Sequence, residues 1–264
     1  MKNIGSYVLI LVAAAVFMGV MPGHGTALAA EKTALRVSAA ISMKDAITAL
    51  RDLYTRKNPA VDVMVNFGSS GMLQKQIEEG APVDLFISAG KKQMDALAAR
   101  GLIVPETRSD LLGNEIVLVV AKEKKTVIKS FADLPDKAKS ISIGQPETVP
   151  AGKYGKETLV SLKLWDRVKA KVMFAKDVRQ VLSYVESGNM DAGLVYLTDT
   201  IVMKSGSVAA TAPKGSHSPI VYPMAVVKDS RNRGAALKFM EFLKSPEAAK
   251  VFSGYKFIPL SVRK

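Results

Sequence analysis

The 264-residue chain has no cysteine and only two histidines. Without a thiol it cannot form a disulfide, use a cysteine nucleophile, bind zinc or an iron–sulfur cluster through cysteine, or carry a lipid on cysteine. The scarcity of histidine argues against His-rich metal sites and most Ser–His catalysis. Because 48% of the residues are apolar and 23% are charged, the composition is that of an ordinary globular protein. The length accommodates one large domain or two modest ones.

Long apolar runs are also scarce, and the one that is present lies at the N-terminus. Lys2 gives a positive start, and no Asp, Glu, Lys or Arg follows until after Ala30. The apolar stretch from Tyr7 to Met21 is the length of a signal-peptide core and short for a membrane span. Ala27-Leu28-Ala29 then offers small residues for cleavage. We expect a signal peptide over residues 1–29 and a periplasmic protein; an uncleaved N-terminal anchor is the alternative.

Acidic residues are outnumbered, with 24 Asp+Glu against 37 Lys+Arg. Loss of Lys2 and His24 with the signal peptide lowers the formal net charge from +13 to +12 and leaves His217 as the remaining histidine. Aromatic residues make up 6% of the chain and are not interleaved with the basic clusters, as stacking platforms for nucleic acid would be. We therefore expect no nucleic-acid partner and a solvated basic surface, which could also steer small anions.

Short β-branched runs alternate with longer amphipathic segments, the pattern of a parallel sheet flanked by helices. In the first part of the chain we expect strands at 35–38, 61–67 and 83–87 and helices at 43–56, 72–79 and 92–100. In the second part we expect strands at 140–143, 172–175 and 192–196 and helices at 153–162 and 178–187. Long strands at 115–121 and 221–227 separate the two parts, and helices at 232–244 and 246–252 end the chain.

Two such series of alternating strands and helices, joined by single long strands, predict an α/β fold of two lobes, each a mostly parallel sheet with flanking helices. The chain would cross between lobes twice, near Gly113 and near Tyr222. We assign residues 30–112 and 223–264 to lobe 1 and residues 113–222 to lobe 2. Because ligands of open α/β sheets bind at the carboxyl ends of the strands, the cleft between the lobes is the expected site.

In lobe 1, the turns after the first two strands carry hydroxyl residues without an adjacent cation. Ser42 opens the first helix, and with Asp45 it also fits a capping box, so a purely structural cap is an alternative for Ser42. The turn Phe67-Gly68-Ser69-Ser70-Gly71 follows the second strand. Its glycines allow a tight turn that exposes backbone N–H groups, although an ordinary turn would have the same composition.

In lobe 2, two further helices begin directly after strands. Pro150 precedes a helix whose first free N–H belongs to Ala151, and Asp177 is the expected N-cap of a helix that starts at Val178. Free N–H groups at helix starts bind oxyanions. The phosphate-binding loops are absent: Gly152-Lys153 is followed by Tyr154, and no G-x-G-x-x-G opens a helix. These turns predict a site for a small oxyanion.

Motifs for catalysis are few. No G-x-S-x-G is present, and Ser88-Ala89-Gly90-Lys91 matches S-x-x-K without the partner motifs of that enzyme class. His217 lies in a Gly-Ser-His-Ser-Pro loop with no acidic neighbour, and Glu78-Glu79 is typical of a solvated helix face. We expect no catalytic residue. A periplasmic hydrolase that uses a carboxylate in the cleft, or a purely structural domain, remains as an alternative.

The turns together resemble those of periplasmic molybdate-binding proteins, the substrate-binding subunits of ABC importers. The matching segments occur in order along nearly all of the chain after residue 30: Ala39-Ala40-Ile41-Ser42, Asn66 to Gly71, Gly80 to Ala89, Leu112-Gly113-Asn114, Val149 to Tyr154, Asp177-Val178-Arg179 and Gly193 to Tyr196. The resemblance implies the two-lobed type II periplasmic binding fold. It also implies a non-enzymatic protein, monomeric and without a cofactor, that delivers its ligand to a membrane permease.

The resemblance further implies which residues hold the ligand. Hydroxyl and backbone N–H groups would come from Ser42 and Ser70, backbone N–H groups from Ala151 and Val178, and a phenol from Tyr196. Molybdenum would be bound only as the oxyanion, through these residues. A fully deprotonated tetrahedral dianion such as molybdate or tungstate accepts every such bond, whereas phosphate retains a proton that would face a donor. Sulfate is also an all-acceptor dianion, so a binder of sulfate or another oxyanion is the alternative within this class.

Overall fold

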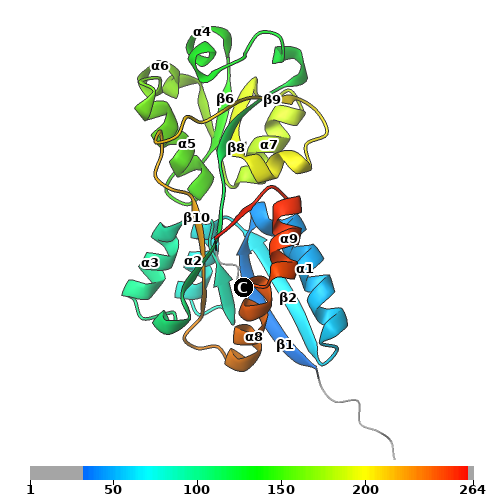
Figure 1. The fold of residues 1–264 in the computed structure, drawn as a ribbon. Helices are drawn as coiled ribbons and strands as arrows, with labels where there is room; N and C mark the ends of the chain where they lie inside the picture. The colour runs from blue at the N-terminus through cyan, green and yellow to red at the C-terminus, as the bar shows by residue number, and fades with distance from the viewer. Residues whose placement is uncertain (1–31, 261–264) are drawn as a thin grey trace, which may run out of the picture. The chain divides into compact units, whose positions relative to one another are not determined.

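The computed structural model describes residues 32–260, which build two β-sheets with helices on their faces (Figure 1). The predicted signal peptide, residues 1–29, lies outside the described residues. The first sheet has six strands in the order β11-β4-β10-β3-β1-β2, and the second has five in the order β7-β6-β8-β5-β9. We call the first sheet with its helices lobe 1 and the second with its helices lobe 2. Both belong to one compact unit of the chain.

Lobe 1 is built from both ends of the described chain. Its strands are β1 Thr33–Ala40, β2 Val61–Gly68, β3 Leu85–Ile87, β4 Ser109–Gly113, β10 Val221–Val226 and β11 Ile258–Pro259. Its helices are α1 Lys44–Lys57, α2 Ser70–Glu78, α3 Lys91–Ala99, α8 Arg233–Leu243 and α9 Pro246–Gly254. Short 3-10 turns lie at Ile41–Met43 and Pro105–Thr107. Helices α2 and α3 pack together on one face of the sheet, and α1, α8 and α9 pack together on the other (Figure 1).

Lobe 2 is built from the middle of the chain. Its strands are β5 Ile116–Val120, β6 Ile141–Gly144, β7 Val172–Ala175, β8 Ala192–Tyr196 and β9 Ser207–Thr211. Its helices are α4 Leu134–Lys137, α5 Pro150–Ser161, α6 Trp165–Val168 and α7 Val178–Glu186, and its 3-10 turns lie at Lys122–Lys124, Phe131–Asp133, Lys169–Lys171 and Leu197–Ile201. Helices α5 and α7 both contact β6 and β8, so they cover the strands whose ends face the cleft.

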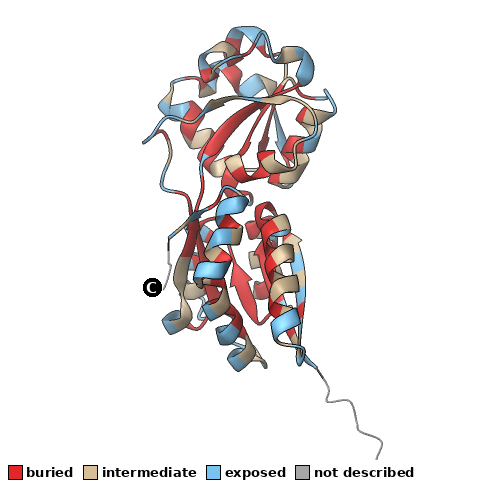
Figure 2. Cartoon of the chain, turned by 45° about the vertical axis from the view of Figure 1, so that its right-hand side comes forward, coloured by how far each residue is buried: buried red, intermediate tan, exposed pale blue. Residues whose placement is uncertain are grey.

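The central strands are buried on both faces, which is why they read as continuous apolar runs rather than as alternating ones. Every residue of β5, β8 and β10 is buried, and Figure 2 shows buried strands in the interior of each lobe. In lobe 1 the core lies in two parts on either side of the sheet. Leu73, Met94 and Leu97 belong to the smaller part, between the sheet and helices α2 and α3.

The two-lobed α/β fold with two chain crossings is confirmed, but both sheets are mixed. Strands β1, β2 and β3 are parallel, as are β6, β7 and β8. The crossing strands β10 and β5 run antiparallel to their neighbours, because the chain enters each lobe from the other one. Strands β4, β9 and β11 were not expected from the sequence. The lobe limits at residues 112/113 and 222/223 stay predictions.

Candidate functional site

A small cavity lies where the carboxyl ends of the parallel strands of the two lobes meet. Its volume is about 10 Å³, far below the range of pockets that hold drug-sized ligands. The lining residues are Ala40, Ile41, Ser42, Gly68, Ser69 and Ser70 from lobe 1 and Val149, Pro150, Ala151, Val178 and Tyr196 from lobe 2. None of these side chains is charged at neutral pH. All five residues that the sequence predicted as ligands line this one cavity.

Strand register places the two serines of lobe 1 side by side. Strands β1 and β2 are parallel, with Ala40 paired to Gly68, so the turns that follow them start at the same edge of the sheet. Ser42 lies in the 3-10 turn after β1, and Ser70 is the first residue of α2. Their exposed fractions are 4% and 1%. Ser42 is not a helix cap: the N-cap of α1 is Met43, without a side-chain cap bond.

In lobe 2, two helix starts and one strand end face the same cavity. Helix α5 begins at Pro150, and helix α7 begins at Val178 behind Asp177, whose side chain accepts a hydrogen bond from the N–H of Gln180 as the predicted N-cap. The first N–H groups of a helix have no partner within the helix. Gly152 allows α5 to approach β6, since a Cβ atom there would lie 1.8 Å from the carbonyl oxygen of Gly144.

The backbone of Ala89 fixes the direction of the Ser70 hydroxyl and accepts a hydrogen bond from the Tyr196 hydroxyl. The N–H of Ala89 donates to Oγ of Ser70 over 2.9 Å, so the hydroxyl hydrogen of Ser70 is left free to donate elsewhere. The phenol of Tyr196 donates to the carbonyl oxygen of Ala89 over 3.2 Å. Tyr196 would have to turn its hydroxyl hydrogen away from Ala89 to donate to a ligand. Burial raises the pKa of Tyr196 well above its usual value, so the phenol stays a donor at neutral pH.

Ser42 has a partner that the sequence analysis missed. Its Oγ lies 3.0 Å from Oη of Tyr222, and Nδ2 of Asn114 donates to the same Tyr222 oxygen over 3.0 Å. Tyr222 and Asn114 both lie on the segments where the chain crosses between the lobes. The only sequence signal was the matching segment Leu112-Gly113-Asn114, which assigned no role to the asparagine. Ser42 and Tyr222 are 180 positions apart, so local sequence could not pair them.

A charged triad behind the cavity was also missed. The guanidinium of Arg179 contacts Asp45 of α1 and Asp199 of lobe 2, each over 2.7 Å. Arg179 follows Val178 directly, and Asp199 also accepts a hydrogen bond from the N–H of Tyr196 over 3.2 Å. Burial raises the pKa of Asp199 to about 6, although Arg179 opposes the shift. The triad thus connects three of the segments that line the cavity.

The lobes also touch through backbone beside the cavity. The N–H of Gly71 in lobe 1 donates to the carbonyl oxygen of Thr148 in lobe 2 over 2.9 Å. A Cβ atom at position 71 would lie 2.6 Å from Cα of Thr148, which is closer than real side-chain contacts allow. Only glycine therefore permits this approach of the lobes.

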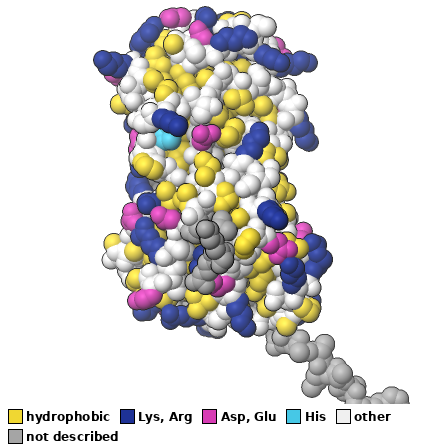
Figure 3. Space-filling model, in the orientation of Figure 1, with side chains coloured by type: hydrophobic (Ala, Val, Ile, Leu, Met, Phe, Trp, Pro, Cys, Tyr) yellow, Lys and Arg dark blue, Asp and Glu magenta, His cyan; other side chains and the backbone are white. Residues whose placement is uncertain are grey.

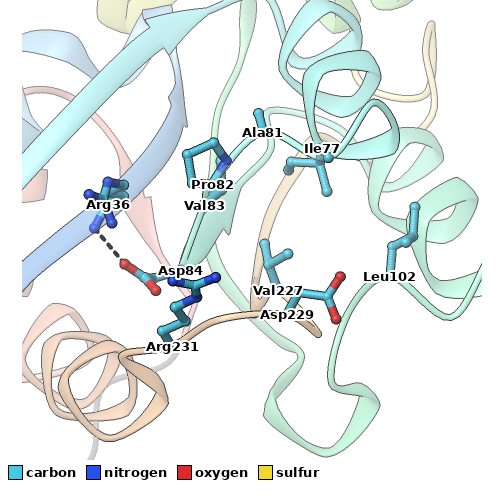
Figure 4. A pocket seen from close by; sticks show the side chains of 11 residues that line it. Arg36, Ile77, Ala81, Pro82, Val83, Asp84, Leu102, Val227, Asp229 and Arg231 are labelled. Carbon is cyan, nitrogen blue, oxygen red and sulfur yellow. Dashed lines mark hydrogen bonds between the residues drawn. The ribbon is translucent and has the colours of Figure 1, made fainter.

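A larger hollow lies in lobe 1, where the chain enters β3 (Figure 4). Its volume is about 350 Å³. The carboxylate of Asp84 there is already satisfied, since it accepts hydrogen bonds from the N–H of Arg36 over 2.8 Å and from Oγ of Ser230 over 2.7 Å. The side chains of Arg36 and Arg231 are exposed to solvent. The charges of this hollow are solvated or already paired, whereas the side chains that line the cavity between the lobes are all neutral.

Other kinds of site find little support among residues 32–260. No group of three or more His, Asp or Glu side chains there could hold a metal ion, and no helix there is long and apolar enough to span a membrane. His217 does not line the cavity; its Nδ1 lies 2.8 Å from the carbonyl oxygen of Ser218. On the face shown in Figure 3, Lys and Arg side chains are scattered among acidic and neutral ones, as expected for a solvated basic surface.

Comparison with known proteins adds independent information. The model of the family described as bacterial extracellular solute-binding protein matches residues 35–257. A Bacillus subtilis protein with the provisional name of ABC transporter substrate-binding lipoprotein is 44% identical over 256 residues, which cover 97% of this chain and 98% of the relative. The molybdate-binding protein ModA of Haemophilus influenzae is 40% identical over 231 residues, which cover 84% of this chain and 88% of the relative.

A solved structure agrees with the fold. The periplasmic molybdate-binding protein of Azotobacter vinelandii superimposes with a TM-score of 0.77 and 26% identity, covering 85% of this chain and 98% of that one. This likeness confirms the predicted periplasmic binding fold. By the extent of the family match and of these relatives, the chain belongs to the family of bacterial extracellular solute-binding proteins.

Proposed function

We propose that this protein captures molybdate, and also tungstate, in the cavity between its lobes and delivers it to the permease of an ABC importer. The observation that carries the proposal is the convergence of Ser42, Ser70, Ala151, Val178 and Tyr196 on one small cavity without a charged side chain. The names of the relatives from Haemophilus influenzae and Azotobacter vinelandii support molybdate as the ligand. The Bacillus subtilis relative supports the ABC importer.

Neutral donors suit a dianion that is never protonated at working pH. Helix starts at α2, α5 and α7 place their first N–H groups and the positive ends of their dipoles at the cavity. Molybdate and tungstate accept a hydrogen bond at every oxygen. Hydrogen phosphate would set its own hydrogen against a donor, at a cost of about 1–3 kcal/mol. Sulfate has no such hydrogen, so the size of the cavity must discriminate against it.

The cavity offers no group for hydrolysis, which argues for binding without turnover. A hydrolase would need a carboxylate or another base within reach of the substrate. The nearby carboxylates Asp45 and Asp199 are paired with Arg179 and are not among the lining residues. We therefore propose a protein without catalytic residues or cofactor, in which molybdenum enters only as the oxyanion.

The remaining parts of the proposal concern the protein in the cell. We propose export to the periplasm with signal-peptide cleavage near Ala29, and a free protein, since the chain has no cysteine to carry a lipid. We also propose a monomer whose lobe 1 comprises residues 30–112 and 223–264 and whose lobe 2 comprises residues 113–222. The lobes would hinge at the two crossings, so that closure around the ligand presents a surface to the permease.

The test removes both serine hydroxyls together. Ser42→Ala with Ser70→Ala takes away two side-chain donors, and we expect molybdate binding measured by isothermal titration calorimetry to fall by at least about 100-fold. The matched control is Ser38→Ala with Ser142→Ala, because both serines are buried but do not line the cavity. Both double variants should unfold cooperatively. Wild-type affinity in the Ser42/Ser70 variant would contradict the site.

A further inference from the structure

The orientation of the Asn114 amide is fixed by its backbone neighbour. The N–H of Glu115 donates to Oδ1 of Asn114 over 2.9 Å, and an N–H cannot meet the amide nitrogen in this way without setting donor against donor. Nδ2 of Asn114 must therefore face the other side. There its two hydrogens go to Oγ1 of Thr198 and to Oη of Tyr222, each over 3.0 Å.

This orientation determines the direction of the next bond. Tyr222 Oη accepts from Asn114, so its own hydrogen needs an acceptor, and Oγ of Ser42 lies 3.0 Å away. The hydroxyl of Tyr196 also interacts with that of Tyr222, but its own hydrogen goes to the carbonyl oxygen of Ala89. In the arrangement that is consistent with this orientation, Nδ2 of Asn114 donates to Oη of Tyr222, and Oη of Tyr222 donates to Oγ of Ser42. The hydroxyl hydrogen of Ser42 is then left for the cavity.

We infer that Tyr222, held by Asn114, is a positioning residue that makes Ser42 donate to the bound oxyanion and thereby sets discrimination against protonated oxyanions. The inference rests on the proposed function. Tyr222 does not line the cavity, so it acts through Ser42 and not through contact with the ligand. A serine whose oxygen already accepts from Tyr222 turns its hydrogen toward the cavity. Every oxygen of a bare dianion can accept that hydrogen, whereas the hydrogen of an X–O–H group would meet a donor.

Burial keeps this direction fixed. Tyr222 is 0% exposed, Thr198 3% and Asn114 7%, so solvent does not offer alternative partners that would let the chain of bonds reverse. Burial also raises the pKa of Tyr222, which keeps its hydroxyl hydrogen in place at neutral pH. Ser70 has an equivalent arrangement, since its Oγ accepts from the N–H of Ala89. That donor is backbone, whereas Tyr222 is a side chain and can be changed.

The experiment compares Tyr222→Phe with wild type on two oxyanions of similar size. Selenate is a bare dianion, whereas arsenate at about pH 8 is a dianion that retains one proton. The variant keeps the ring and removes the hydroxyl, so Ser42 Oγ regains the freedom to accept. We expect the preference for selenate over arsenate to fall roughly tenfold or more, measured by isothermal titration or by competition with molybdate.

Three further variants separate this role from a general loss of packing. Tyr54→Phe removes a phenol from a buried tyrosine that packs on Phe239 and Phe242, and it should leave the preference unchanged. In a Ser42→Ala background, Tyr222→Phe should no longer change the preference, because it acts through that serine. Asn114→Ser removes the amide donor and should shift the preference in the same direction, which keeps the test open if Tyr222→Phe does not fold.

Two negative results have different meanings. If wild type binds molybdate but the preference for selenate over arsenate is the same in Tyr222→Phe or Asn114→Ser, the positioning role is wrong and the proposed function stands. If wild type binds no oxyanion, the proposed function fails, and the inference fails with it.

Discussion

The hydroxyl groups at the cavity are set in direction by donors behind them. Ser70 accepts from the N–H of Ala89, and Ser42 accepts from Tyr222. Each serine is thereby left with one hydrogen for a ligand. The charged groups stay out of the cavity wall: Asp45, Arg179 and Asp199 neutralise one another in part, with a residual charge of one carboxylate. A pocket for a dianion is thus formed from neutral dipoles, which require no counter-charge to be buried when the ligand is absent.

The buried carboxylate of Asp199 predicts a specific pH dependence of stability. Its pKa is about 6 in the folded protein, against 3.8 for an unperturbed group, so the folded state holds the proton more tightly than the unfolded chain. This group stabilises the fold below pH about 4, and that contribution, about 1–3 kcal/mol, is lost as the pH rises through about 6. The melting temperature of wild type should therefore fall relative to that of Asp199→Asn as the pH rises from 4 to 7.

The control for this titration is an exposed carboxylate. Asp136 is 73% exposed in its side chain, and Asp136→Asn should differ from wild type by a nearly constant melting temperature over the same range. A constant difference for Asp199→Asn would contradict the assignment of the raised pKa.

The residues that line the cavity could be predicted from the sequence, whereas the residues that support them from outside the cavity could not. Ser42, Ser70, Ala151 and Val178 sit at helix starts, which leave a signal in local sequence through glycine, proline and hydroxyl residues. Tyr222 owes its role to partners more than 100 positions away, and Arg179 contacts Asp45, which is 134 positions away, as well as Asp199. No local pattern distinguishes a tyrosine that supports a serine from one that fills a core.

The elements around the cavity are placed by parallel pairing. Helices α2, α5 and α7 follow β2, β6 and β7, whose parallel neighbours end at the same edge of each sheet. Because every strand–helix turn in such a unit faces one edge, the helix starts converge without long-range signals. Contact between the lobes then depends on small residues, of which Gly71 is the clearest case.

Gly71→Ala should weaken ligand binding by obstructing the approach of the lobes. The added Cβ would collide with the backbone of Thr148, which cannot yield as a flexible side chain can. We expect molybdate affinity to fall by at least about tenfold, while the melting temperature without ligand changes little, because separated lobes have no such conflict. Gly234→Ala is the matched control: it lies in helix α8 with no heavy atom within 4 Å of the added Cβ. Equal affinities in the two variants would contradict the role of Gly71.

The elements missed from the sequence are short or lie at sheet edges. Strand β11 spans two residues, and β9 is an edge strand whose residues are exposed or half-buried, so neither has the apolar run that marks a buried strand. Strand β4 has two polar residues before its apolar ones. The antiparallel crossing strands were recognised as strands, but their direction depends on the path of the chain between lobes, which periodicity does not encode.

Over the full described chain, the two lobes share two crossing segments that carry Asn114 and Tyr222. The segments that would bend during closure therefore also hold the polar groups that orient Ser42. This arrangement couples the geometry of the hinge to the direction of a donor in the cavity.

The surface charge has a separate role: a net charge of +13 over the sequence attracts small anions from a distance without selecting among them.

The most direct test of the account is isothermal titration of the purified protein, starting at Ala30, with molybdate, tungstate, sulfate and phosphate. We predict tight one-to-one binding of molybdate and tungstate, with sulfate much weaker because of its size and phosphate weaker still because of its proton. Binding of none of the four would contradict an oxyanion site in this cavity. Binding of sulfate as tight as that of molybdate would contradict selection by size.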